Sequence, residues 1–119
     1  MPNAPSKLTI ALAQLNPLVG DLDGNAEKLL AARETAAAQG ADLLVLPELF
    51  ITGYPPEDLV RRPAFQQAAR NAVEQLAARL PAAGPAVLMG TIWPDDGKLY
   101  NAVVLLDQGR ISAIRFKVE

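Results

Sequence analysis

The chain has 119 residues, of which 50% are hydrophobic and 20% charged, with a net charge of -2 and neither cysteine nor histidine. This length suits one globular domain or part of a larger one. The missing residue types exclude disulfides, Cys/His zinc sites, Ser-His-Asp triads and Cys-His pairs within these residues.

Charge and hydropathy exclude further classes of protein. No basic cluster occurs beyond Arg61 and Arg62, which argues against a nucleic-acid partner, and we interpret that pair as a solvated helix start. No apolar run approaches the roughly 20 residues of a membrane span, so no membrane partner is expected. Met1–Ser6 lacks the features of a signal peptide, so we expect a cytoplasmic location. No glycine-rich phosphate-binding motif is present.

The first part of the chain predicts a strand followed by a helix. Leu8–Leu15 is almost entirely apolar and is predicted to be a buried strand. A helix capped by Asn25 is expected to run to about Gln39, with Gly40 as its left-handed stop. Its predicted apolar stripe consists of Ala26, Leu29, Leu30, Ala36 and Ala37.

A second strand is predicted to lead directly into a carboxylate. The apolar run Leu43–Leu46 is typical of a strand buried on both faces, and Pro47 ends it because proline has no ladder donor. Glu48 follows, next to the large side chains of Leu49–Ile51. We expect these side chains to desolvate the carboxylate partly and raise its pKa, making it a proton acceptor near neutral pH. The alternative is an ordinary loop glutamate, solvated or capping a helix.

The second part of the chain predicts a helix and then an antiparallel meander. After a rigid turn at Thr52–Pro56, a helix is expected to begin at Pro63 and to end at Pro81–Pro85. Three strands joined by short turns follow: Ala86–Trp93, Leu99–Leu106 and Arg110–Val118. The predicted fold is therefore α/β, with two strand–helix units followed by the meander.

Two further side chains are candidates for chemistry. Lys117 lies late in the last strand, where an ammonium beside a carboxylate would stabilise a developing oxyanion; the alternative is an edge-strand lysine that prevents aggregation. Tyr54 would offer its hydroxyl to a polar substrate, or simply pack against the neighbouring prolines. Two acid pairs in turns are interpreted as turn formers, and no metal site is expected: Asp21 with Asp23, and Asp95 with Asp96.

Three blocks of this sequence resemble the carbon–nitrogen hydrolase (nitrilase) superfamily. The block ADLLVLPELFITGYPPEDL is similar to the family's signature, and its TGYPPEDL portion is most similar to the glutaminase domain of glutamine-dependent NAD+ synthetases. The other blocks are LTIALAQLNPLVGDLDGNAEKL and GTIWPDDGKLYNAVVLLDQGRISAIRFK, which contains Asn101 and ends at the lysine. They occur in the family's order and spacing, so the resemblance covers Lys7–Glu119.

The resemblance implies the first half of an α-β-β-α sandwich and a Glu-Lys-Cys triad. Glu48 would be the general base, Lys117 would steady the tetrahedral oxyanion, and Tyr54 would bind substrate near the active-site entrance. The cysteine would attack the side-chain amide of glutamine and release ammonia for the conversion of deamido-NAD to NAD+. No cofactor is implied for this portion, whereas ATP and Mg²⁺ are implied for a separate synthetase domain.

The family's cysteine lies beyond its lysine, and this sequence has none. We therefore expect residues 1–119 to be the N-terminal portion of a longer glutaminase domain, inactive alone, whose parent protein takes glutamine and forms a homo-oligomer. The alternatives are a free-standing nitrilase-type amidase on another small amide, and an inactive binding or assembly module. Because two helices cover only one side of a sheet, we also expect its other face to be uncovered.

Overall fold

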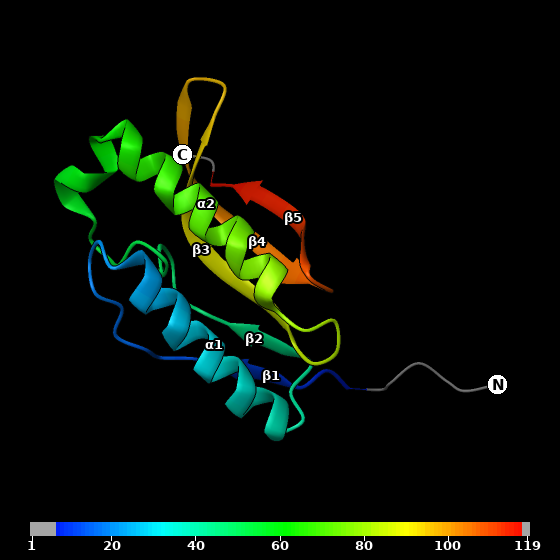
Figure 1. Cartoon of the computed structure of the whole chain (residues 1–119). Coiled ribbons are helices and arrows are strands. Elements are labelled where there is room, and N and C mark those ends of the chain that lie inside the picture. The colour runs from blue at the N-terminus through cyan, green and yellow to red at the C-terminus, as the bar shows by residue number, and fades with distance from the viewer. Residues whose placement is uncertain (1–6, 118–119) are drawn as a thin grey trace.

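The computed structural model describes residues 7–117. In this range a five-stranded sheet carries two α-helices on one face (Figure 1). The strands are β1 (Ile10–Leu12), β2 (Leu43–Val45), β3 (Ala86–Asp95), β4 (Lys98–Asp107) and β5 (Arg110–Phe116). The helices are α1 (Leu22–Ala38), α2 (Pro63–Arg79) and the short 3-10 helix η1 (Glu57–Arg61). The predicted order of two strand–helix units and a meander is confirmed.

The sheet changes from parallel to antiparallel pairing at β3. β1 pairs with β2 and β2 with β3 in parallel, and the crossovers contain α1 and α2. β3, β4 and β5 then form two antiparallel hairpins. The two residues of each hairpin turn both have positive φ, as two-residue hairpin loops prefer. These pairs are Asp96-Gly97 and Gln108-Gly109. The expected end of the last strand at Val118 lies outside the described residues.

The first two strands are less buried than the sequence predicts. The prediction of a buried strand over Leu8–Leu15 is wrong, because β1 spans only three residues at the edge of the sheet and Leu12 is 73% exposed. In β2, Leu44 is buried but Leu43 and Val45 are only partly so. Both strands present side chains to the helix-free face, and an apolar sequence does not reveal which face of a strand is covered.

Helix α1 is capped by Asp21 and not, as predicted, by Asn25. The Asp21 Oδ1 atom accepts a hydrogen bond from the Gly24 N–H at 3.0 Å, and the helix begins at Leu22, directly after Asp21. Aspartate and asparagine are about equally good caps, so the residue types alone did not decide between the two positions. The predicted stop at Gly40 is consistent with its φ of 77°.

Asn25, in the first turn of α1, instead hydrogen-bonds to two loops, the one before α1 and the one after β2. It is fully buried, and its amide nitrogen donates to the Leu18 carbonyl at 2.8 Å and to the Ile51 carbonyl at 3.0 Å. Its amide oxygen accepts the Leu18 N–H at 2.9 Å. The loop before α1 is therefore bound to the loop after β2, in which Glu48 lies.

The core lies between the two helices and the sheet. The buried stripe of α1 includes Arg33 but neither Leu30, which is partly buried, nor Ala37, which is exposed. The Arg33 guanidinium donates to the carbonyls of Pro81, Ala83 and Pro85, which satisfies this buried charge and holds the loop before β3. The largest fully buried apolar side chains are Phe50, Leu29, Leu44, Ile51, Leu76, Met89, Leu106, Val73, Val87 and Val104.

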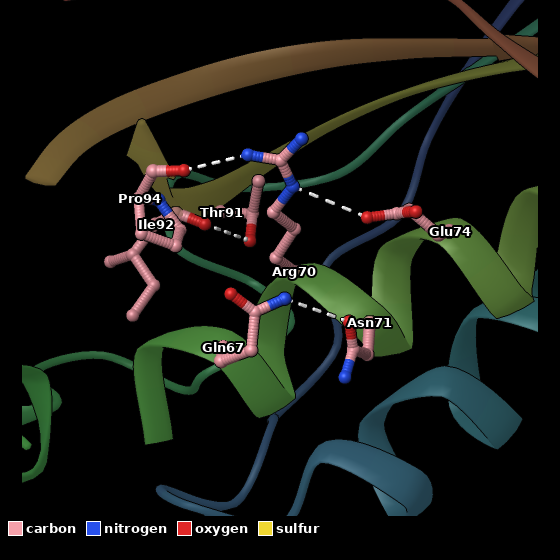
Figure 2. A network of polar contacts seen from close by, with 7 residues as sticks. All are labelled: Gln67, Arg70, Asn71, Glu74, Thr91, Ile92 and Pro94. Carbon is pink, nitrogen blue, oxygen red and sulfur yellow. Dashed lines mark hydrogen bonds and ion pairs between the residues drawn. The ribbon is translucent and has the colours of Figure 1, made fainter. Parts of the chain in front are cut away.

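A second arginine fastens α2 to the end of β3, as Figure 2 shows. Arg70 Nη1 donates to the Pro94 carbonyl at 2.8 Å, and its Nε lies 3.2 Å from Glu74 Oε1. The guanidinium also lies 4.5 Å from the centre of the Trp93 ring, a cation–π contact. Trp93 is buried.

The sheet face opposite the helices is open and largely apolar. Ile10, Leu12 and Val103 all expose more than two fifths of their surface, and the partly buried Leu88 and Leu105 lie in register with Leu12 on the same face. The expectation of an uncovered face is thus confirmed for the part of the chain that the structure describes. Within that part, no helix has the length and apolar character needed to cross a membrane.

Candidate active site

Glu48 lies just beyond β2, where the chain turns over the sheet. Leu49 has a φ of 53°, and the following turn buries the side chains of Leu49, Phe50 and Ile51 while Glu48 stays exposed. Gly90 of β3 allows this loop to approach: a Cβ at Gly90 would lie 2.4 Å from the Leu49 nitrogen and 2.8 Å from the Glu48 Cα. The position of Glu48 therefore depends on a glycine, which has no side chain, at position 90 of the neighbouring strand.

Two side chains from distant segments of the chain meet at this acid. Glu48 Oε1 accepts a hydrogen bond from Asn101 Nδ2 at 2.6 Å and another from Lys117 Nζ at 3.1 Å. Asn101 lies on β4 and Lys117 directly follows β5. The Asn101 carbonyl also accepts the Lys117 N–H at 2.8 Å, which extends the β4–β5 ladder to the lysine. The two residues nominated from the sequence thus form an ion pair.

The electrostatics differ from the expectation for Glu48. Its side chain is 49% exposed and that of Lys117 is 63% exposed. The hydrogen bond from Asn101, followed by the hydrogen bond and charge of Lys117, holds the pKa of Glu48 below its ordinary value. The prediction of a raised pKa is wrong for this structure, because the neighbouring apolar side chains turn into the core and do not cover the carboxylate.

The three polar side chains border an open hollow of about 520 Å³ on the helix-free face. Its walls are mostly apolar, and Arg115 adds a second cation to its rim. The lining residues are Val45, Leu46, Glu48, Leu88, Met89, Gly90, Asn101, Val103, Arg115, Phe116 and Lys117. A hollow of this size with a few convergent polar groups suits a small polar molecule.

Tyr54 does not line this hollow, and its side chain is 66% exposed. The structure therefore does not bring it to Glu48, and its substrate-binding role stays a prediction. Among residues 7–117, no three Asp or Glu side chains gather as a metal site would require. Of the acids interpreted as turn formers, Asp21 caps α1 and Asp96 occupies the β3–β4 turn.

Asn101 is the site residue that the sequence reasoning did not assign a role. In the sequence it stands only within a block that resembles the family. The signal in the sequence was an amide within the otherwise apolar strand LYNAVVLL. A partly buried amide on a strand face needs a partner, and here that partner is the carboxylate.

The α/β fold and the pairing of Glu48 with Lys117 agree with the carbon–nitrogen hydrolase class, and comparison with known families shows that class. Residues 9–118 match the carbon-nitrogen hydrolase family, so the chain belongs to it. The chain is 47% identical over 111 residues to the glutamine-dependent NAD(+) synthetase of Rhodobacter capsulatus, covering 93% of this chain and 20% of that protein. It is 44% identical over 110 residues to that of Synechocystis sp., covering 87% and 20%.

Solved structures agree with the fold. A glutamine-dependent NAD(+) synthetase from Cytophaga hutchinsonii matches with a TM-score of 0.86 and 30% identity, over 96% of this chain and 19% of that one. An amidase from Nesterenkonia sp. matches with a TM-score of 0.77 and 28% identity, over 94% and 43%. The chain thus spans about a fifth of the length of the synthetases it matches.

Proposed function

We propose that residues 1–119 are the N-terminal portion of a glutaminase domain. The complete protein would hydrolyse the side-chain amide of glutamine and supply the ammonia for ATP-dependent conversion of deamido-NAD to NAD+. The observation that carries this proposal is the ion pair of Glu48 and Lys117, joined by Asn101 across three segments of the sheet. Identities of 42–47% to glutamine-dependent NAD(+) synthetases support the substrate.

In the first half of the proposed reaction, Glu48 takes the proton of a cysteine thiol that residues outside this sequence supply. The sulfur attacks the amide carbon, and the Lys117 ammonium stabilises the negative charge that develops on the carbonyl oxygen. The carbon–nitrogen bond then breaks, and the leaving nitrogen takes the proton from Glu48 and departs as ammonia. A thioester of the glutamate side chain remains.

The second half repeats these roles, with water in place of the thiol. Glu48 takes a proton from water as its oxygen attacks the thioester carbon, and Lys117 again faces the oxyanion. The carbon–sulfur bond breaks, the thiolate regains the proton, and glutamate leaves. In this proposed reaction, the reacting groups that this chain supplies are therefore the Glu48 carboxylate and the Lys117 ammonium.

The lowered pKa of Glu48 belongs to an open site. A carboxylate with two donors is a weak base, and covering the hollow would desolvate it and shift its pKa upward. The second half of the proposed sandwich would provide this cover over the apolar face. We assign ATP and Mg²⁺ to residues outside this chain, and we expect the complete protein to be a cytoplasmic homo-oligomer.

The test uses the complete protein that contains this chain. Glu48→Gln and Lys117→Ala should each lower glutamine-dependent NAD+ synthesis by about 10³-fold or more, since members of a catalytic triad act as a unit. Ammonia-dependent synthesis should persist, because these residues do not serve that reaction. Glu34→Gln, an exposed acid on α1, is the matched control and should retain both activities.

Retention of glutamine hydrolysis by Glu48→Gln or Lys117→Ala would refute the proposed roles. If the wild-type protein hydrolyses another small amide but makes no NAD+ from glutamine, the amidase alternative holds. The similarity to the Nesterenkonia amidase is the observation that favours this second candidate. If the complete protein hydrolyses no amide, the chain is a binding or assembly module.

A further inference from the structure

We propose that Asn101 is a positioning residue that occupies Glu48 Oε1 and anchors Lys117, so that Glu48 Oε2 is the atom that exchanges protons. The catalytic meaning of this inference rests on the proposed glutaminase function. The geometry behind the inference does not depend on that function. It consists of two hydrogen bonds made by one residue, one donated to Glu48 and one accepted from the main-chain N–H of Lys117.

Asn101 is the residue that both members of the pair share. Its side chain donates to Glu48 Oε1 at 2.6 Å, while its main-chain carbonyl accepts the Lys117 N–H at 2.8 Å. It lies within β4 opposite Ile92 of β3, so its own backbone is held by the centre of the antiparallel sheet. A residue on a rigid strand therefore sets the separation between the Glu48 carboxylate and the Lys117 backbone.

Lys117 alone would not orient the carboxylate. Its side chain is a flexible four-carbon chain that is 63% exposed, and its ammonium lies 3.1 Å from Oε1. The asparagine side chain has two rotatable bonds and reaches the same oxygen at a shorter distance. Because an amide does not titrate, this donor persists at every working pH.

Both donors bind the same carboxylate oxygen, which distinguishes the two oxygens chemically. Protonation of Oε1 would weaken the hydrogen bonds from both Asn101 and Lys117. Among the described residues, Oε2 accepts no hydrogen bond. The proton from the thiol would therefore be received on Oε2 and would leave from there to the departing nitrogen.

The asparagine donor also makes Glu48 a better acid once it is protonated. The bond from Asn101 is the largest cause of the lowered pKa of Glu48. The group must release its proton to ammonia in each turnover, and stabilisation of the anion favours that release. Asn101 thus opposes proton uptake and assists proton return.

The first measurement is the acidic limb of the pH profile of glutamine-dependent kcat/KM in the complete protein, which reports the base of the free enzyme. Asn101→Leu removes the donor at similar volume and should move this limb to higher pH by about one unit. Asn101→Asp replaces the donor with a like charge and should move it further. Asn101→Ser, a smaller change, tests the same direction if the leucine variant does not fold.

The matched control is Asn71→Leu, which removes an exposed amide of α2 whose side chain hydrogen-bonds only with Gln67 among the described residues (Figure 2). This variant should leave the limb unchanged. An unchanged limb in folded Asn101→Leu or Asn101→Ser would overturn the proposal. A fall in activity without a shift of the limb would also overturn it, because that result indicates a merely structural residue.

A second measurement separates this inference from the proposed function. Titration of the Glu48 carboxyl carbon by ¹³C NMR, in the complete protein and its Asn101→Leu variant, needs no turnover. A higher titration midpoint in the variant supports Asn101 as the positioning residue even if the wild type does not hydrolyse glutamine. Equal midpoints overturn the inference even if glutamine hydrolysis is found.

Discussion

The carboxylate of Glu48 is bound to an amide and an ammonium, and both bonds are weakened when it takes a proton. Its pKa in the folded chain lies below its ordinary value, so the unfolded chain binds this proton more tightly. The bonds therefore stabilise the fold above the ordinary carboxyl pKa, about pH 4, and this contribution is lost as the pH falls through the lowered folded value.

We predict that the free energy of unfolding of the wild type, minus that of Glu48→Gln, decreases as the pH falls from about 6 to about 3. The glutamine variant cannot titrate at this position, so the subtraction isolates the carboxyl group. Urea unfolding of the complete protein at several pH values measures the difference. A difference that stays constant, or increases toward low pH, would show that the pKa is not lowered.

At the residue scale, the sequence nominates Glu48 and Lys117 for the site but does not predict the electrostatics of Glu48. Glu48 and Lys117 could be nominated because an acid after a buried strand and a lysine in an apolar strand are unusual, and because the flanking blocks resemble a known family. The direction of the pKa shift of Glu48 could not be predicted, since it depends on Asn101, which lies 53 residues away in the chain. It also depends on whether the leucine and phenylalanine after Glu48 cover the carboxylate or turn into the core.

At the scale of elements, the Glu48 loop and strand β3 are in contact through Gly90. An added methyl group at Gly90 would overlap backbone atoms of Leu49 and Glu48, which cannot rotate away as a side chain does. We predict that Gly90→Ala destabilises the fold by about 2 kcal/mol and displaces Glu48 from Asn101. Urea unfolding and glutamine-dependent activity of the complete protein measure the two effects.

Gly97→Ala is the control for Gly90→Ala. Gly97 has a φ of 75° in the β3–β4 turn, and no atom lies within 4 Å of a Cβ there. Alanine at this position should cost about 1 kcal/mol of backbone strain and leave the glutamine-dependent activity intact. If Gly90→Ala retains full activity and stability, the loop is not held by close contact with β3.

Element order was predictable, but burial and caps were less so. The meander and the start of α2 at Pro63 follow from local signals: turn residues, apolar runs and a proline at the first helical position. The exposure of Leu12 and the capping role of Asp21 depend on what each segment packs against. Local patterns do not contain that information, because an edge strand and a central strand can have the same composition.

At the scale of the whole molecule, the site is built from three segments that only the complete sheet brings together. Parallel pairing of β2 with β3 places Glu48 beside Gly90, and the meander then places Asn101 and Lys117 on the same face. This is the face that the two helices leave open (Figure 1). The catalytic candidates and the uncovered apolar surface therefore lie on one side of the molecule, where a second layer would both complete the site and exclude water.

The same face predicts the behaviour of residues 1–119 expressed alone. Exposed apolar strand residues such as Leu12 and Val103 should drive self-association, because a large apolar patch is poorly tolerated in water. Light scattering coupled to size exclusion should show oligomers or aggregates, and Leu12→Glu with Val103→Lys should reduce them. Leu18→Glu, which changes an apolar residue that is 59% exposed in the loop before α1, should not reduce them. A monodisperse wild-type monomer with cooperative unfolding in calorimetry would contradict this prediction, and equal effects of both substitutions would show that association does not use the sheet face.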